Sequence, residues 1–206
     1  MMKENNYADL PFSQACENNK TAILTLLQQA FAHCSKVLEI GSGTGQHALH
    51  FAKHLPHLYW QASDQPIYLS ALAERIRRAA LPNLPCPLQL DICADGAPTT
   101  PADGLFTANT LHIMPWPVVE HFFSRLTELT AARASLCIYG PFNYNGQFSS
   151  ASNRAFDNSL KNRDPAMGIR DIEQVLVLAA RQGFSLNQDF AMPANNRLLW
   201  FTKEGL

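Results

Sequence analysis

The sequence has little charge and no excess of basic residues. Only 16% of its 206 residues are Asp, Glu, Lys or Arg, below the usual share of about 25%, and 16 basic residues stand against 17 acidic ones. Without a basic surplus the chain cannot neutralise a phosphate backbone, so we expect no nucleic-acid partner. The hydrophobic share of 47% excludes wholesale disorder. Polarity must therefore come from neutral groups such as Asn, Gln, Ser, Thr and His, which suit a hydrogen-bonding pocket.

The sequence also lacks cysteine pairs and long apolar runs. Its five cysteines are odd in number and form no C-x-x-C pair, which is typical of a reducing compartment rather than of a disulfide framework. No apolar stretch approaches the roughly 20 residues of a membrane-spanning helix. Residues 1–12 contain no apolar core of the length that a secretory signal needs. We therefore predict a cytoplasmic protein without a membrane partner.

Four histidines fall on one stripe of a predicted helix and raise the question of a metal site. His47, His50, His54 and His57 follow helical spacing, but no acid or cysteine accompanies them. Because the stripe adjoins the apolar face of the same helix, we interpret it as a half-exposed surface and predict no bound metal.

Strand and helix patterns alternate along the chain. This order predicts an α/β fold, a doubly wound and mostly parallel sheet with helices on both faces, formed as one domain by residues 1–206. The last two strands have no helix between them and should pair as an antiparallel hairpin, with a reversed strand near one edge of the sheet. The predicted strands are 36–40, 58–63, 86–92, 104–109, 134–140, 184–190 and 197–203, and the predicted helices are 21–32, 46–55, 68–81, 117–132 and 170–182.

A glycine-rich turn, GSGTG at 41–45, joins the first predicted strand to a helix. Such a turn lets backbone N–H groups approach a ligand at a helix N-terminus. A P-loop would need Gly-Lys-Ser/Thr after the turn, and the dinucleotide pattern would need glycine at position 46, where the chain has Gln46. Glu39 lies two residues before the first glycine; it would repel a pyrophosphate but can face the amino group of an amino-acid-like ligand. The turn therefore favours S-adenosylmethionine over NAD.

Two further acids end the next two predicted strands. Asp64 follows Gly41 by 23 residues, where a carboxylate can accept both ribose hydroxyls. Asp91 could accept the adenine amino group, while the backbone N–H of Ile92 or Cys93 reads the ring nitrogen. Open α/β sheets bind ligands at the carboxyl ends of their strands, so these groups should meet at one edge. The predicted cofactor-binding residues are Glu39, Gly41, Ser42, Gly43, Gly45, Asp64, Asp91, Ile92 and Asn109.

At these residues the chain resembles the class I S-adenosylmethionine-dependent methyltransferases, and more closely an uncharacterised methyltransferase-like family with members in bacteria and animals. The resemblance implies a seven-stranded sheet with a final antiparallel strand, and it supplies no substrate. The run ENNK at 17–20 departs from the family pattern, which has a basic residue before Asn19, so we carry over no contact with the cofactor carboxylate there. The resembling stretches are VLEIGSGTGQHALHFAKHLPHLYWQASD, NTLHIMPW, YGPFNYNGQF, SNRAFDNSL, RDPAMGIRD and MPANN, between about Asn18 and Asn196.

Candidates for the chemistry follow the fourth predicted strand. Asn109, His112 and Trp116 lie near where a transferable methyl group should point. His112 has the intrinsic pKa of a general base and could instead orient the acceptor; the alternative is a histidine fixed by hydrogen bonds at the start of a loop. The Asn-Pro-Pro-Tyr signature of many amino-group methylases is replaced by Asn109-Thr110-Leu111-His112, which makes a DNA or protein-amide substrate less favoured.

A connection of 29 residues, 141–169, follows the fifth predicted strand. Loops longer than about 12–15 residues tend to be functional lids or to contain short helices, so we predict a lid or substrate loop here. The alternative is a surface excursion that covers the edge of the sheet. Asparagines of the turn 193–196 could reach the same mouth, or serve turn geometry alone. The predicted acceptor-binding residues are Trp116, Tyr139, Asn143, Tyr144, Asp164 and Asn195.

The leading hypothesis is therefore a methyltransferase that uses S-adenosylmethionine on a small-molecule acceptor, with His112 as base or orienting group. A second hypothesis is a non-catalytic protein that binds S-adenosylmethionine and uses the same fold for interaction. A third is a nicotinamide-dependent oxidoreductase, which requires Glu39 and Gln46 to be misread.

Overall fold

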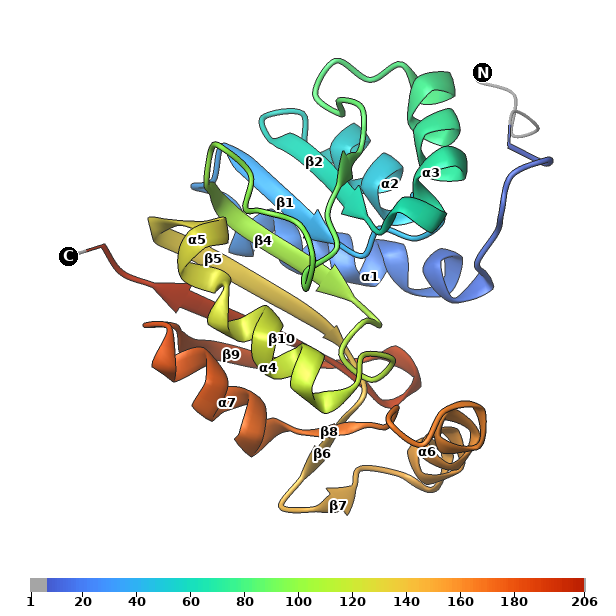
Figure 1. The fold of residues 1–206 in the computed structure, drawn as a ribbon, viewed down its shortest axis with the longest axis vertical. Coiled ribbons are helices and arrows are strands. Elements are labelled where there is room, and N and C mark those ends of the chain that lie inside the picture. Colours follow the sequence, from blue (N-terminus) through green and yellow to red (C-terminus); the bar gives the residue numbers. More distant parts are fainter. Residues whose placement is uncertain (1–6, 206) are drawn as a thin grey trace.

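The structure, a computed structural model, describes residues 7–205. Its centre is a seven-stranded sheet of order β3-β2-β1-β4-β5-β10-β9 (Figure 1). The strands β1, β2, β3, β4 and β5 all run parallel, whereas β10 is antiparallel to both of its neighbours, β5 and β9. The strands of this sheet are β1 (Lys36–Ile40), β2 (Tyr59–Asp64), β3 (Leu88–Gln89), β4 (Ala102–Ala108), β5 (Thr130–Gly140), β9 (Ser185–Met192) and β10 (Asn196–Lys203). The predicted doubly wound sheet and its final antiparallel hairpin are confirmed.

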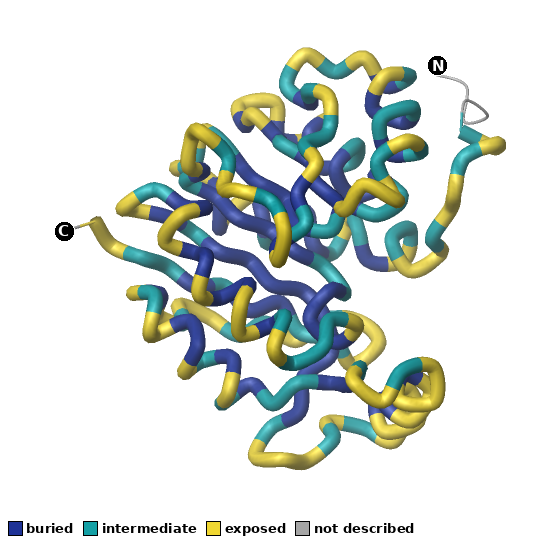
Figure 2. Tube along the Cα trace, viewed as in Figure 1, coloured by how far each residue is buried: buried dark blue, intermediate teal, exposed yellow. Residues whose placement is uncertain are grey.

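Helices cover both faces of this sheet because successive strand residues point to opposite sides. Val37 packs with α1, α2 and α3, while its neighbour Leu38 packs with α4, α5 and α7. Figure 1 shows α4 in front of the sheet and α1 behind it, and Figure 2 shows the strands between them as the most buried part of the chain. The helices are α1 (Gln14–Ala30), α2 (Gln46–His54), α3 (Pro66–Ala79), α4 (Trp116–Ser124), α5 (Leu126–Leu129) and α7 (Ile172–Arg181).

Three element boundaries differ from the predicted ones by three residues or more, each for a local reason. The helix α1 begins at residue 14 and not 21, because the side chain of Ser13 caps it by accepting a hydrogen bond from Cys16 N. The strand β3 ends at residue 89, because the carboxylates of Asp91 and Asp95 hold a turn directly after it. Residues 130–132, predicted as helix, begin β5, where Thr130 pairs with β4.

The connection 141–169 contains regular structure of its own. A small sheet of order β7-β6-β8 is formed by β6 (Phe142–Tyr144), β7 (Gln147–Phe148) and β8 (Arg170–Asp171). Between β7 and β8 lies α6 (Ala151–Arg163), beyond the carboxyl end of β5 (Figure 1). Its buried residues are Asn153, Asp157 and Leu160, so two of the three side chains with which it packs are polar. The helix therefore packs largely through hydrogen bonds and ion pairs, and the rest of its surface is exposed (Figure 2).

Two sequence expectations concern the ends of the chain and the membrane. The expectation that no secretory signal is present depends partly on residues 1–6, which lie outside the described residues. Among the described helices none has the length and apolar character needed to cross a membrane.

Candidate functional site

A cavity of about 650 Å³ opens at the carboxyl ends of the parallel strands. Segments far apart in the sequence form it, and we divide them into two walls and a floor. The turn wall consists of Ser13, Ala15, Cys16, Asn18 and Asn19 of α1 and its cap, with Gly41, Ser42, Gly43, Thr44 and His47. The floor consists of Ala108, Asn109, His112, Tyr139 and Pro141. The α6 wall consists of Ser152, Asn153 and Phe156 with Pro193, Ala194, Asn195 and Asn196.

The glycine turn presents its backbone to the cavity. Gly43 has φ +53°, and a Cβ atom built there would meet no atom of the described chain within 4 Å. Its N–H donates to Oδ2 of Asp64 at 2.6 Å, so the acid that ends β2 holds the turn in place. Gly41 has φ +72°, and a Cβ there would lie 2.7 Å from Cγ2 of Thr110. Both positions therefore require glycine. Gly43 leaves the backbone open to an approaching ligand, and Gly41 lets the turn pack closely against Thr110, in the segment after β4.

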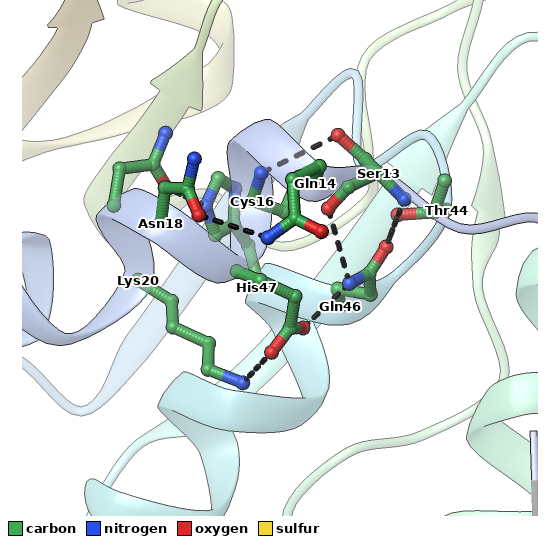
Figure 3. A network of polar contacts seen from close by, with 10 residues as sticks. Ser13, Gln14, Cys16, Asn18, Lys20, Thr44, Gln46 and His47 are labelled. Carbon is green, nitrogen blue, oxygen red and sulfur yellow. Dashed lines mark hydrogen bonds and ion pairs between the residues drawn. The ribbon is translucent and has the colours of Figure 1, made fainter. Parts of the chain in front are cut away.

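Gln46, which replaces the glycine of a dinucleotide turn, joins α1 to the glycine turn. Its Oε1 accepts a hydrogen bond from Ser13 N at 2.6 Å, and its Nε2 donates to Oε1 of Glu17 at 2.5 Å. Thr44 Oγ1 donates to the same Oε1 at 3.0 Å (Figure 3). Gly45 caps α2 beside Gln46, and a Cβ there would lie 2.6 Å from Leu72 Cδ1 of α3. Gln46, the residue whose presence disfavours an NAD site, thus holds α1 against the glycine turn as part of the turn wall.

Glu39 lies behind the turn and outside the cavity lining. Its side chain is 2% exposed, and Trp60 Nε1 donates to its Oε2 at 2.8 Å. Burial raises the pKa of this carboxyl to about 7, and the neighbouring carboxylate of Asp64 adds to the rise, while hydrogen bonds from Trp60 and Ser42 oppose it. The carboxyl therefore changes its charge near neutral pH. Its predicted contact with a cofactor amino group stays a prediction.

Asp64, Asp91 and Ile92 also lie outside the cavity lining. Both carboxylate oxygens of Asp64 accept backbone N–H groups, from Gly43 at 2.6 Å and from the next residue, Gln65, at 2.8 Å. Burial raises the pKa of Asp64 against the effect of these two bonds. Asp91 Oδ1 accepts from Cys93 N at 2.8 Å. The predicted ribose and adenine contacts therefore remain predictions. Asp64 has a structural role as well, because it holds the glycine turn through Gly43 N.

Buried polar residues of α1 and α2 complete the turn wall. Nε2 of His47 donates to Oδ1 of Asn19 at 2.6 Å, since an amide oxygen can only accept. Burial lowers the pKa of His47 to about 4, so its ring is neutral at pH 7. Burial raises the pKa of the Tyr139 hydroxyl, and hydrogen bonding with the side chains of Asn19 and Asn196 opposes this rise. Asn19 belongs to the turn wall and Asn196 to the α6 wall. Among the four histidines predicted to form a half-exposed stripe, His47 is thus buried in the cavity wall.

His112 and Asn109 form the centre of the floor. Asn109 has φ +60°, and its N–H donates to Tyr139 O at 2.8 Å. A Cβ built at Gly140 would lie 3.7 Å from Nδ1 of His112 and 3.9 Å from Oδ1 of Asn109, so both polar atoms face the space above this glycine. Burial, with Arg170 and Arg163 nearby, lowers the pKa of His112 to about 4. The floor therefore offers a neutral imidazole and an amide at neutral pH.

The cavity lining includes two of the six predicted acceptor-binding residues, Tyr139 and Asn195. Trp116 begins α4, where Arg170 lies over its ring at 5.9 Å. Tyr144 donates its hydroxyl to Asp189 Oδ2 at 2.6 Å, which ties β6 to β9. Asp164 ends α6 and accepts from Ala166 N. Asn143 is buried in β6, and its Oδ1 has no partner in the described part of the chain. These four side chains lie outside the cavity lining.

Sequence reasoning missed the contributions of α1 and of Phe156 to the cavity. The predicted helix 21–32 omits residues 14–20, and the Ser13 cap directly before them is the signal that extends the helix. Phe156 lies three residues after Asn153 on α6, so helical spacing brings both to one face once a helix is recognised. Within residues 7–205, no group of three or more His, Cys, Asp and Glu side chains is arranged to hold a metal ion.

Comparison with known proteins supports the architecture of the site. Residues 10–203 match the family model described as "Protein of unknown function (DUF938)". A crystal structure of the S-adenosylmethionine-dependent methyltransferase SibL in its apo form is 18% identical, with a TM-score of 0.76 over 92% of this chain and 55% of that chain. The O-methyltransferase family 2 protein from Planctomyces limnophilus, in complex with apigenin, is 16% identical, with a TM-score of 0.78 over 92% and 58%. The mitomycin 7-O-methyltransferase MmcR is 17% identical, with a TM-score of 0.72 over 89% and 55%.

This chain spans little more than half the length of these solved structures. At such identities the likeness establishes a class I methyltransferase fold, and that is what it shows about this chain.

Proposed function

The chain belongs to the family described as "Protein of unknown function (DUF938)", and from that premise we propose that it transfers a methyl group from S-adenosylmethionine to a small-molecule acceptor. One observation carries the proposal. The N–H of Gly43 is held by Asp64 at the edge of an open cavity, and the same cavity continues to His112. A ligand bound to the turn would therefore leave the His112 end of the same cavity open to a second ligand.

We assign the cofactor to the turn wall and to the ends of β2 and β3. Gly41, Ser42 and Gly43 would pack against its amino-acid part, with Asn109 close to the sulfur. The open space above Gly43 supports this fit, because a side chain there would fill it. Glu39 would balance the amino group from behind the turn. For the adenosine part we retain Asp64 on the ribose and Asp91 with Ile92 on the adenine.

When bound, S-adenosylmethionine supplies a sulfonium methyl group for in-line displacement, so alignment of the acceptor provides much of the rate. His112 and Asn109 would position the acceptor above Gly140. A base with a pKa of about 4 is poorly matched to removing a proton at neutral pH, so we assign His112 to orientation rather than to proton removal. We propose that 141–169 acts as the acceptor-binding lid of a single domain, since α6 lies over this end of the sheet.

Isothermal titration with S-adenosylmethionine tests the cofactor assignment. We expect saturable binding that S-adenosylhomocysteine competes away and that NADH does not. No heat of binding at millimolar cofactor would overturn it.

The alternative is a cofactor-binding protein without catalysis, which would use the same turn wall and cavity. The two functions separate in one assay, transfer of labelled methyl groups from S-adenosylmethionine into metabolite extracts. Labelled small molecules support the methyltransferase; cofactor binding without any labelled product supports the second function.

A further inference from the structure

The lining of the cavity is polar but uncharged. Among residues 7–205, those that line it include asparagine, serine, threonine, histidine and tyrosine, and no Asp, Glu, Lys or Arg. Its two histidines, His47 and His112, are neutral at pH 7 because burial lowers both pKa values to about 4. A charged ligand group that enters the acceptor side would lose its water without gaining an ionic partner, which is costly.

Two charged side chains near the cavity, those of Glu17 and Arg170, are engaged elsewhere. Glu17 pairs with Lys20 and accepts a hydrogen bond from Gln46. Arg170 donates from Nε to Leu111 O at 3.0 Å, and its Nη2 donates to the carbonyl oxygens of Met114 and Ala166. Its guanidinium therefore raises the positive potential near His112 without lining the cavity. That potential disfavours a cation more than an anion.

Amides dominate the α6 wall. Asn153 Nδ2 donates to Ser149 Oγ at 2.8 Å and to Asn195 O at 3.0 Å, and Asn195 Nδ2 donates to Ser152 Oγ at 3.0 Å. The two bonds that involve Asn195 join α6 to the β9–β10 turn, and all three use amide N–H groups. The side-chain oxygens of Asn153 and Asn195 have no hydrogen bond to another part of the described chain, so each can accept one from a ligand.

Phe156 supplies the apolar part of this wall. It is 40% exposed although it lines the cavity, and its ring meets that of His112 edge-on, at 5.3 Å between centroids and 75° between planes. An aromatic side chain held this way leaves a face free. A second ring packed on it would gain apolar burial and an aromatic contact.

We propose that the acceptor side of the cavity takes an uncharged molecule with a flat ring, which packs on Phe156 while its polar groups bond to the asparagine amides and to His112. This inference rests on the proposed function for the assignment of that side to the acceptor. It excludes carboxylates, phosphates and protonated amines as the main recognition group.

Three probes of one shape and different charge test it: benzamide, benzoate and benzamidine, titrated into the protein saturated with S-adenosylhomocysteine and followed by ¹⁵N chemical shifts. We expect benzamide to bind with shifts in Asn153, Phe156 and His112. Benzoate should bind roughly tenfold more weakly and benzamidine more weakly still, because each charge is desolvated without a partner. Equal or tighter binding of either charged probe, or no binding of benzamide at millimolar concentration, would overturn the proposal.

Phe156→Ala should weaken benzamide binding roughly fivefold, through lost ring packing, and leave cofactor affinity within twofold. Val177→Ala is the matched control, because Val177 is an apolar residue of α7 that is 52% exposed and lies outside the cavity lining. If S-adenosylmethionine itself fails to bind, the proposed function fails. If the cofactor binds but a charged probe binds as tightly as benzamide or more tightly, this inference alone fails. It also fails alone if Phe156→Ala leaves benzamide binding unchanged.

Discussion

The two walls of the cavity are built in different ways. The turn wall includes the backbone of the glycine turn, and it is fixed by buried groups: Asp64 holds Gly43, and Gln46 joins the turn to α1. The α6 wall presents side chains, and its helix is mostly exposed, with Asn153 linking it to the β9–β10 turn. Contacts from the backbone do not depend on side-chain identity and suit a ligand that is always the same. Exposed side chains can be substituted without disturbing the core. The difference fits a constant cofactor on one wall and a family-specific acceptor on the other.

Asp64→Ala should have the largest effect and act on the turn wall alone. It removes two charge-assisted hydrogen bonds, to Gly43 N and Gln65 N, together with the proposed ribose contact. We expect the affinity for S-adenosylmethionine to fall about a thousandfold, measured by isothermal titration.

Asp103→Ala is its matched control. The Asp103 carboxylate likewise accepts backbone N–H groups, from Ser35 and Lys36, but it lies at the opposite end of the sheet. Cofactor affinity should stay within about twofold in this variant. An equal loss in both variants would mean that Asp64 acts through general stability and not through the turn.

Glu39→Gln should alter the pH dependence of stability. The pKa of Glu39 is raised from 4.5 to about 7, so the folded state holds this proton more tightly than the unfolded state. The resulting stability is present below pH 4.5 and is lost as the pH rises through 7. At about pH 8 the variant should be more stable than the wild type by about 3 kcal/mol, and the difference should vanish near pH 4.

Urea unfolding at the two pH values measures this effect. A difference of the same size at both would show that the substitution changes packing and not ionisation. Cofactor binding gives a second readout: a carboxylate that balances the cofactor ammonium should make wild-type affinity rise with pH through 7, and the variant should lose that dependence.

Asn153→Ala should weaken the α6 wall without affecting the turn wall. It removes the hydrogen bond to Asn195 O that joins α6 to the β9–β10 turn and the local hydrogen bond to Ser149 Oγ. We expect benzamide affinity to fall roughly fivefold and stability to fall by about 1–2 kcal/mol, with cofactor affinity unchanged. Asn158→Ala, at an exposed position of the same helix, serves as the control. A parallel loss of cofactor affinity would contradict the separation of the two walls.

Gly140→Ala should have the smallest effect. The new methyl group would lie 3.7 Å from Nδ1 of His112 and 3.9 Å from Oδ1 of Asn109, which is ordinary contact. It crowds the polar atoms of His112 and Asn109 in the floor, so benzamide should bind about threefold more weakly. The melting temperature should stay level or rise, because alanine reduces the entropy of the unfolded chain. Gly96→Ala, where a Cβ meets nothing within 4 Å, is the control, and unchanged benzamide binding in Gly140→Ala would place the acceptor elsewhere.

The sequence predicts the turn wall much better than the α6 wall, for a physical reason. Gly41, Gly43 and Asp64 serve backbone geometry at the ends of adjacent strands, and such geometry has a short sequence signature. The mostly parallel sheet follows from the alternation of strand and helix, and its antiparallel hairpin from the missing helix between β9 and β10.

The α6 wall depends on tertiary packing that no local pattern carries. Tyr144 and Asn143 are polar residues of the predicted lid, yet they serve β6 and its contacts, with Tyr144 bonded to Asp189. Asn153 and Phe156 face the cavity because α6 packs through Asp157, which accepts from Ile169 N at 2.8 Å and pairs with Lys161. Only the folded chain brings Asn153 and Asn195, 42 residues apart, into contact.

A crystal structure with S-adenosylhomocysteine tests the central claim most directly. We expect the homocysteine backbone against Gly41 and Gly43, the ribose hydroxyls on Asp64, and the sulfur facing the space between Asn109 and His112. A ligand bound at another edge of the sheet, or a sulfur turned away from the α6 wall, would contradict it.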